Sequence, residues 1–137
     1  MPAGYSGTPL VRKLGIKAGF KLWVIGPPLN YWDLLGTLPD DVSIDQPDGG
    51  PFDFIHVFVT NGAQLEEQLG VLRARIVPAG MIWVSWPKKL SHVATDLNET
   101  IIRDLALRSG LVDVKVCAVD ATWSGLKLVI RLRDRPE

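Results

Sequence analysis

The residues best suited to bind a small molecule follow an apolar segment at residues 81–86. This segment predicts a buried strand, and Trp86, Lys88 and Lys89 lie at its carboxyl end. In open α/β sheets, the carboxyl ends of parallel strands face the crevice that binds ligands. Indole rings stack on flat molecules, and lysines attract anions. The segment therefore predicts a site for a flat or anionic small molecule.

A second polar segment, residues 120–124, joins the last two predicted strands and belongs to the same predicted site. Its useful side chains are Asp120, Trp123 and Ser124, which could orient a ligand and cover its second face. Both segments lie at one end of the sheet in the topology derived below. The candidate ligand-binding residues are therefore Trp86, Lys88, Lys89, Asp120, Trp123 and Ser124. In the alternative interpretation, both tryptophans cover the end of the sheet and the lysines are solvated.

Other reactive residue types give weaker signals. His56 lies inside an apolar run, which favours a hydrogen-bonded core histidine over a ligand. Cys117 lies in mid-strand without a nearby histidine, as a buried, inert thiol would. Lys115 and Lys127 form either a basic strip on one face of the last two strands or an ordinary exposed polar face. The sequence identifies no catalytic residue.

Composition excludes several classes of protein. The 137 residues are 47% hydrophobic and 22% charged, which predicts one domain over residues 1–137. Fifteen basic residues balance fifteen acidic ones, so we expect no DNA binding. No apolar run approaches the ~20 residues of a membrane span, and the start does not resemble a secretory signal, so we expect a cytoplasmic protein. One cysteine and two distant histidines predict no metal site.

Hydrophobic periodicity predicts alternating strands and helices after an N-terminal helical segment (residues 1–19), whose helix begins at Thr8 and Pro9. Strands are expected at residues 20–26, 42–45, 52–60 and 81–86. Between them we expect a helix at residues 31–38 and one that begins at Asn61, includes Ile76 and ends at residues 78–80. A third helix is predicted to begin at Asp96, with Leu97, Ile101 and Leu105 facing inward.

The last third of the chain predicts a closing antiparallel hairpin over residues 111–132. Two alternating segments, residues 111–119 and 123–132, are separated by only a few residues, which is too short for a parallel connection. Matching their apolar faces leaves two registers, one with Lys115 opposite Lys127 and one with Asp113 opposite Arg131. Like charges directly opposite each other are unfavourable, so the second register is preferred.

The resulting fold class is α/β, with a Rossmann-like, mostly parallel sheet of about six strands in the order 2-1-3-4-6-5 and helices on both faces. This order resembles the class I methyltransferase fold with one β-α unit missing. The resemblance implies S-adenosylmethionine as cofactor, a glycine-rich turn at Gly26 and an acidic residue at Asp45. The turn is Gly26-Pro27-Pro28, in which two prolines remove N–H donors, so the sequence disfavours this cofactor.

The chain is also similar in sequence to a family of small bacterial proteins known only as a domain of unknown function, family 3052. The similarity lies in residues 6–10, 13–16, 83–89 (WVSWPKK), 95–97 and 110–129, which include VKVCAVD and WSGLK. This resemblance implies a fold and no activity.

The function predicted first is a non-catalytic or unassigned α/β domain that acts as a small-ligand-binding or protein-interaction module. The alternative is a divergent S-adenosylmethionine-dependent methyltransferase or another small transferase. A third interpretation is self-association through the edge of residues 42–45 or through the hairpin, which would make a homo-oligomer.

Overall fold

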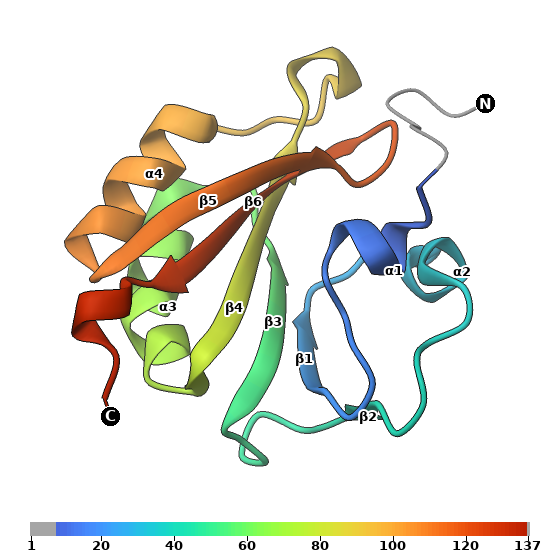
Figure 1. Ribbon diagram of the computed structural model, residues 1–137. Coiled ribbons are helices and arrows are strands. Elements are labelled where there is room, and N and C mark those ends of the chain that lie inside the picture. The colour runs from blue at the N-terminus through green and yellow to red at the C-terminus, as the bar shows by residue number, and fades with distance from the viewer. Residues whose placement is uncertain (1–7, 137) are drawn as a thin grey trace.

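The computed structural model describes residues 8–136 and contains one six-stranded sheet (Figure 1). The strand order is β2-β1-β3-β4-β6-β5, as predicted. Neighbouring strands from β2 to β4 are parallel, and β6 runs antiparallel between β4 and β5. The strands are β1 (Lys21–Ile25), β2 (Ser43–Ile44), β3 (Phe52–Phe58), β4 (Ile76–Pro87), β5 (Leu111–Ala118) and β6 (Trp123–Ile130).

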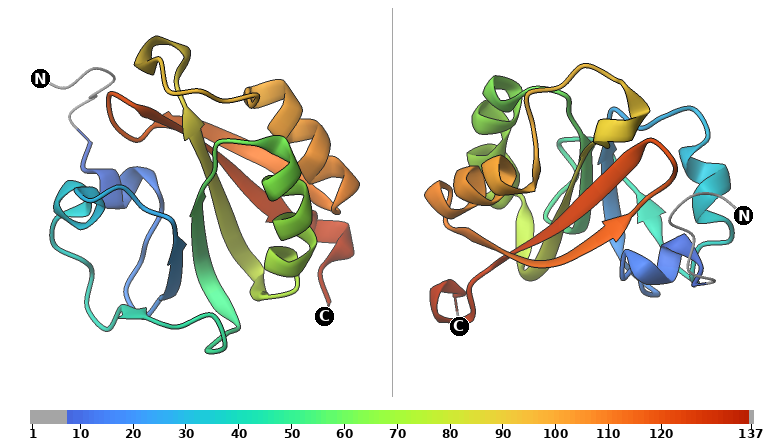
Figure 2. Two further views of the ribbon diagram at one scale, coloured as in Figure 1. Left: turned by 180° about the vertical axis from the view of Figure 1, so that it is seen from behind. Right: turned by 90° about the horizontal axis from the view of Figure 1, so that it is seen from above.

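Helices cover both faces of the sheet, as predicted. Helices α3 (Gly62–Arg73) and α4 (Glu99–Arg108) lie on one face, and α1 (Leu10–Lys13) and α2 (Tyr31–Leu35) lie on the other (Figure 2). Two single-turn 3-10 helices, η1 (Lys89–Ser91) and η2 (Leu132–Asp134), complete the structure. No helix within residues 8–136 is long and apolar enough to cross a membrane. The part of the predicted N-terminal segment before Thr8 lies outside the described residues.

The central strands hold two hydrophobic clusters, one on each face of the sheet. On β3, Ile55 and Val57 pack beneath α3 and α4, whereas Phe54 and Phe58 pack beneath α1 and α2. Trp83 of β4 is completely buried in the second cluster. Its indole nitrogen donates a hydrogen bond of 2.9 Å to the backbone oxygen of Leu14, which ties the end of α1 to the sheet.

Several predicted boundaries are wrong. Helix α3 begins after Asn61 as predicted, since the Asn61 side chain accepts from the backbone nitrogen of Gln64. It ends at Arg73, however, because Ile76 pairs with Phe52 as the first residue of β4. Helix α4 is capped by Asn98 rather than Asp96.

The shift of the α4 cap changes which side chains face the core. Leu97 and Leu105 are buried as predicted, but Ile102 takes the inward position expected for Ile101, which is 37% exposed. The two helices on the opposite face are shorter than predicted. Helix α1 begins only after Pro9, and α2 ends at Gly36, whose φ is +74°. A positive φ favours glycine and ends a helix.

The preferred hairpin register is also wrong. Lys115 lies opposite Lys127, and a bulge at Val114 shifts the pairing so that Asp113 faces Leu128. The turn explains this register, because the Asp120 carboxylate accepts from the backbone nitrogens of the two residues that close it, Thr122 and Trp123. The cross-strand partner expected for Asp113 is replaced by Arg103 of α4, at 3.0 Å.

Candidate functional site

The two tryptophans of the predicted site lie on opposite faces of the sheet. Trp86 pairs with Ser124 and packs in the cluster beneath α3 and α4. Trp123 pairs with Pro87 and packs against the other cluster, where its ring meets Phe58 edge-on with 5.1 Å between centroids. Successive side chains of a strand point to opposite faces, so these two indoles do not form the walls of one pocket.

The polar residues of the predicted site are also separated. The Asp120 carboxylate accepts hydrogen bonds of 2.8 and 2.7 Å from two backbone nitrogens of its own turn. Lys89 is exposed at the start of η1, and Ser124 is half-buried in β6. Lys88 is anchored to the hairpin turn, because its backbone nitrogen donates to the oxygen of Thr122 at 2.7 Å. Of these residues, only Lys88 contributes charge to the hollow described below.

The positions implied for S-adenosylmethionine, Gly26 and Asp45, do not meet. Strand β2 pairs only with the first two residues of β1, so Asp45 lies level with Trp23 rather than with the end of the strand. Its carboxylate is 3.5 Å from the amine of Lys21. A Cβ atom at Gly26 would lie 3.3 Å from the backbone oxygen of Phe58, so the turn lies directly against β3. The carboxylate implied for the cofactor is therefore paired, and the implied glycine is packed against the neighbouring strand.

The carboxyl end of β3 is closed by the loop that leads from β4 to α4 (Figure 1). The hydroxyl of Thr95 donates to the backbone oxygen of Thr60 at 2.6 Å. The carboxylate of Asp96 accepts from the backbone nitrogen of Gly62 at 2.8 Å, in the first turn of α3. A helix N-terminus attracts anions, and here the chain supplies its own.

His56 is a buried core histidine, as predicted. Its Nδ1 lies 2.8 Å from the hydroxyl of Tyr31, and its Nε2 lies 2.7 Å from the hydroxyl of Ser85. All three side chains are completely buried. Burial lowers the pKa of His56 from 6.5 to about 3, so the ring is neutral at physiological pH. The trio resembles a nucleophile with its base, but no substrate reaches a hydroxyl sealed in the core, and its role is structural.

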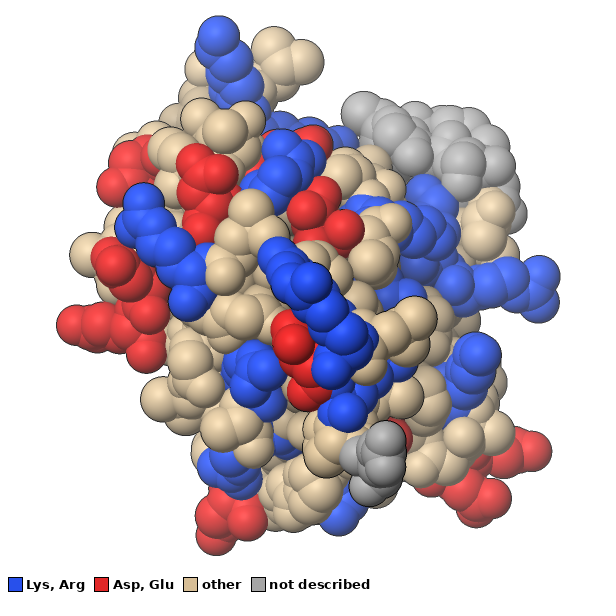
Figure 3. All heavy atoms as spheres, turned by 60° about the vertical axis from the view of Figure 1, so that its left-hand side comes forward, with Lys and Arg blue, Asp and Glu red and all other residues tan. Residues whose placement is uncertain are grey.

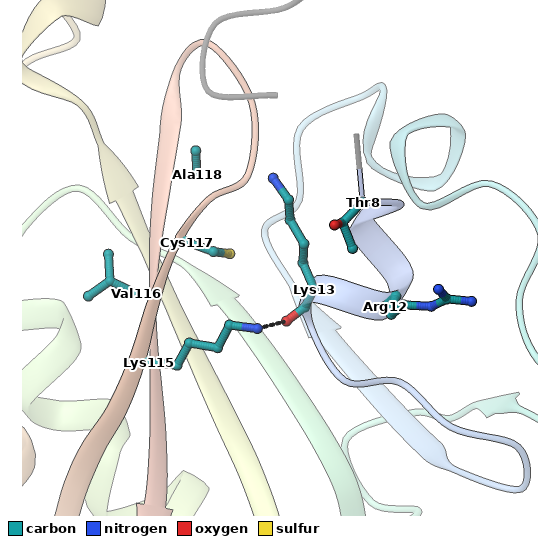
Figure 4. Close-up of a pocket in the computed structure, with 7 residues that line it drawn as sticks. All are labelled: Thr8, Arg12, Lys13, Lys115, Val116, Cys117 and Ala118. Carbon is teal, nitrogen blue, oxygen red and sulfur yellow. Dashed lines mark hydrogen bonds between the residues drawn. The ribbon is translucent and has the colours of Figure 1, made fainter. Parts of the chain in front are cut away.

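A hollow of about 430 Å³ lies between α1 and β5. Figure 4 shows the side chains of Lys13 and Lys115 extending into the gap between the two elements, with the sulfur of Cys117 turned toward α1. The amine of Lys115 donates to the backbone oxygen of Lys13 at 3.1 Å, across 102 residues of sequence. We call this site the basic hollow; it is lined by Thr8, Arg12, Lys13, Lys115, Val116, Cys117 and Ala118.

Positive charge extends beyond the lining of the basic hollow. Lys127 lies opposite Lys115, and burial, followed by the charges of Lys115 and Lys17, lowers its pKa. The charge of Lys88, whose backbone is bonded to the hairpin turn, also lowers the pKa of Cys117. The ion pairs within residues 8–136 involve none of these lysines. In Figure 3, basic side chains spread over the centre and right of the surface, while the largest acidic group lies at the left edge.

Cys117 is only half-buried, which corrects the prediction of a buried thiol. Its pKa is nevertheless raised, because desolvation outweighs the opposing charges of Lys13, Lys115 and Lys88. The protonated thiol is a weak nucleophile, so the cysteine is a wall of the hollow rather than a reactive group. Within residues 8–136, no group of three or more His, Cys, Asp or Glu side chains could hold a metal ion.

The sequence does not identify the basic hollow, although it allows Lys115 and Lys127 to form a basic strip. The signal was present in the first hairpin register, which places the two lysines together. Repulsion between the two lysines disfavours that register, yet the structure adopts it, and the repulsion is now a feature of the site. The sequence does not indicate that Lys13 lies near Lys115, because only the docking of α1 on the sheet brings it to β5.

Comparison with known proteins shows the fold. No protein-family model and no curated protein matches the chain, so the resemblance to family 3052 remains a prediction. Solved structures do match. An S-adenosylmethionine-dependent methyltransferase from Aquifex aeolicus is 14% identical with a TM-score of 0.61, over 89% of this chain and 88% of its own.

Two further solved structures match with similar sequence identity, TM-score and coverage. DhpI in complex with S-adenosylhomocysteine is 13% identical with a TM-score of 0.63, over 91% of this chain and 83% of its own. Magnesium protoporphyrin IX methyltransferase from Synechocystis, with bound S-adenosylhomocysteine, is 12% identical with a TM-score of 0.57, over 89% and 78%. The chain therefore has the Rossmann-like fold of the class I methyltransferases.

Proposed function

We propose that this chain is a methyltransferase-fold protein that binds a small anionic molecule in the basic hollow. One observation carries the proposal: of the seven lining residues that the structure describes, three are basic and none is acidic. The chain as a whole is neutral, with fifteen residues of each sign, so this local excess is not a consequence of composition.

The shape and chemistry of the basic hollow suit a small molecule. A volume of about 430 Å³ falls in the range of ligand pockets, roughly 300–1,000 Å³. Lys115 supplies further N–H donors besides the one given to Lys13, and the hydroxyl of Thr8 can donate or accept. Val116 and Ala118 add apolar wall. The described lining contains no activated nucleophile, so binding rather than catalysis is the proposed activity.

A divergent S-adenosylmethionine-dependent transferase is the second candidate. The fold favours it, because the methyltransferases from Aquifex aeolicus and Synechocystis share the arrangement of this chain. The geometry at Gly26 and Asp45 argues for the anion-binding function instead, as the residues implied for the cofactor are closed or paired. The two candidates place a ligand at different parts of the sheet and are separable by mutation.

Thermal shift and titration calorimetry test the proposal. The probes are inorganic phosphate, sulfate and citrate, together with S-adenosylmethionine and S-adenosylhomocysteine. We expect an anion near saturation to raise the Tm by a few degrees. Lys115→Gln should abolish that shift, and Arg133→Gln, at the exposed η2, is the matched control.

Two other results would reject the proposal. A shift with S-adenosylmethionine alone, retained in Lys115→Gln, would support the transferase. An anion-induced shift equal in Lys115→Gln and in the wild type would show that the basic hollow is not the site.

A further inference from the structure

Two lysines lie opposite each other across the closing hairpin, although the sequence allows a second strand register that would separate them. Lys115 lies directly opposite Lys127, and Lys17 adds a third charge. Directly opposed like charges in a sheet are destabilising. A register with Asp113 opposite Arg131 would avoid this repulsion, yet the structure keeps the lysines together.

The local backbone shows how this arrangement is held. A bulge takes Val114 out of the strand pairing, so that Asp113 lies opposite Leu128 and Lys115 lies opposite Lys127. The side chain of Asp113 pairs with Arg103 of α4. Among residues 8–136, the Lys115 amine donates its hydrogen bond to the backbone oxygen of Lys13, which carries no full charge. Violations of a local rule that persist in a folded protein concentrate at functional sites.

The number and type of the cations restrict the ligand. A carboxylate carries one charge and is typically held by the two-pronged contact of an arginine. In Figure 4, the side chain of Arg12 points away from the gap, whereas those of Lys13 and Lys115 point into it. Lysine amines act as point charges, a suitable arrangement for a phosphate group. A phosphate monoester approaches two negative charges at pH 7, which matches the two positive charges of the lysines that lie opposite each other in the hairpin.

The hollow is larger than a phosphate group needs. Its volume of about 430 Å³ leaves room for an organic portion against Val116 and Ala118. Together with the proposed anion-binding function, on which this step rests, we infer that the ligand is a small phosphate monoester whose dianionic phosphoryl group lies between Lys115 and Lys127.

Phenyl phosphate and phenyl sulfate are the probes that test this inference, since they share a body and differ in charge. The sulfate ester is a monoanion throughout, whereas the phosphate ester gains its second charge near pH 6. At pH 7.5, calorimetry should give phenyl phosphate an affinity about tenfold higher, the equivalent of one charge-assisted contact. At pH 5 the two affinities should converge.

Variants locate the phosphoryl group. Lys115→Gln and Lys127→Gln should each remove the preference for phosphate, and Lys115→Arg should restore part of it because the charge returns. Circular dichroism checks that each variant is folded. Arg133→Gln should behave as the wild type.

The remaining outcomes distinguish the two claims. Equal affinity for both esters, lost in Lys115→Gln, would overturn the phosphate inference and leave the anion-binding function standing. No binding of either ester, of inorganic phosphate, sulfate or citrate would overturn both. A phosphate preference that survives in Lys127→Gln would show that the lysine pair does not hold the group.

Discussion

The carboxylates Asp45 and Asp96 and the lysines at the basic hollow have their charges met in opposite ways. Asp45, beside the start of β1, is paired with Lys21, and Asp96, at the carboxyl end of β3, accepts from the first turn of α3. Beside the hollow, Lys115 lies opposite Lys127, and the ion pairs within residues 8–136 include neither lysine. The protein's own groups therefore satisfy the two carboxylates, whereas the two lysines have no counter-charge among the described residues.

This difference shows that two proteins can share a fold without sharing a ligand site. A strand order is maintained by buried apolar side chains, such as Phe54 and Trp83, which do not depend on what binds at the surface. A ligand site depends on a few polar groups whose partners can change without disturbing the core. A local excess of one charge is therefore a better guide to the site than the fold is.

The largest effect on stability is expected at His56, because each of its ring nitrogens has a buried hydrogen-bond partner. Its pKa is about 3 in the folded protein and near 6.5 when unfolded, so the unfolded chain binds a proton between these pH values. Stability is present above pH 6.5 and decreases as the pH falls toward 3, by on the order of 5 kcal/mol. Urea unfolding from pH 7.5 to 3.5 measures it. His56→Gln should show a shallower decline, and an equal slope would contradict the assignment.

Trp83 is expected to affect both the stability of the core and anion binding in the basic hollow. Trp83→Ala should reduce the free energy of unfolding by about 3–5 kcal/mol and release the end of α1, because the bond to Leu14 is lost. Anion binding in the folded fraction should weaken as well. Trp32→Ala, at a side chain that is 39% exposed, is the control and should cost under about 1 kcal/mol. A similar loss in both variants would contradict a special role for Trp83.

Asp96 and Lys115 should respond to mutation with opposite signs. Asp96→Ala should destabilise the protein by about 1 kcal/mol, because α3 loses the carboxylate at its first turn. Lys115→Gln should instead be neutral or stabilise by up to about 1 kcal/mol, because the repulsion with Lys127 is removed. Denaturant midpoints compare the two. Equal destabilisation would show that Lys115 is a structural residue.

The smallest effect is expected at Asp45. Its ion pair with Lys21 joins side chains that are 38% and 39% exposed, and such pairs contribute about 0–1 kcal/mol. Asp45→Asn should therefore change the Tm by only a few degrees at most and leave anion binding unchanged. Loss of an S-adenosylmethionine-induced Tm shift in this variant would instead favour the transferase.

Much of the fold could be predicted because its signals are local. Buried runs such as residues 52–58, the cap at Asn61 and the short hairpin connection each depend on neighbouring residues. The end of α3 and the start of α4 were misplaced where tertiary contacts override those signals. Ile76 pairs with β3, and Asp96 caps a different helix from the one that follows it.

The sequence by itself determined the strand order, the two-faced core and the burial of His56. Apolar periodicity and right-handed crossovers leave few alternatives for these features. Only the tertiary structure decided the hairpin register and the basic hollow. The register depends on a bulge and on Arg103, and the hollow joins Lys13 to Lys115 across 102 residues. Repulsion between two lysines is small beside the packing of the sheet, so the sequence rule that separates like charges was outweighed.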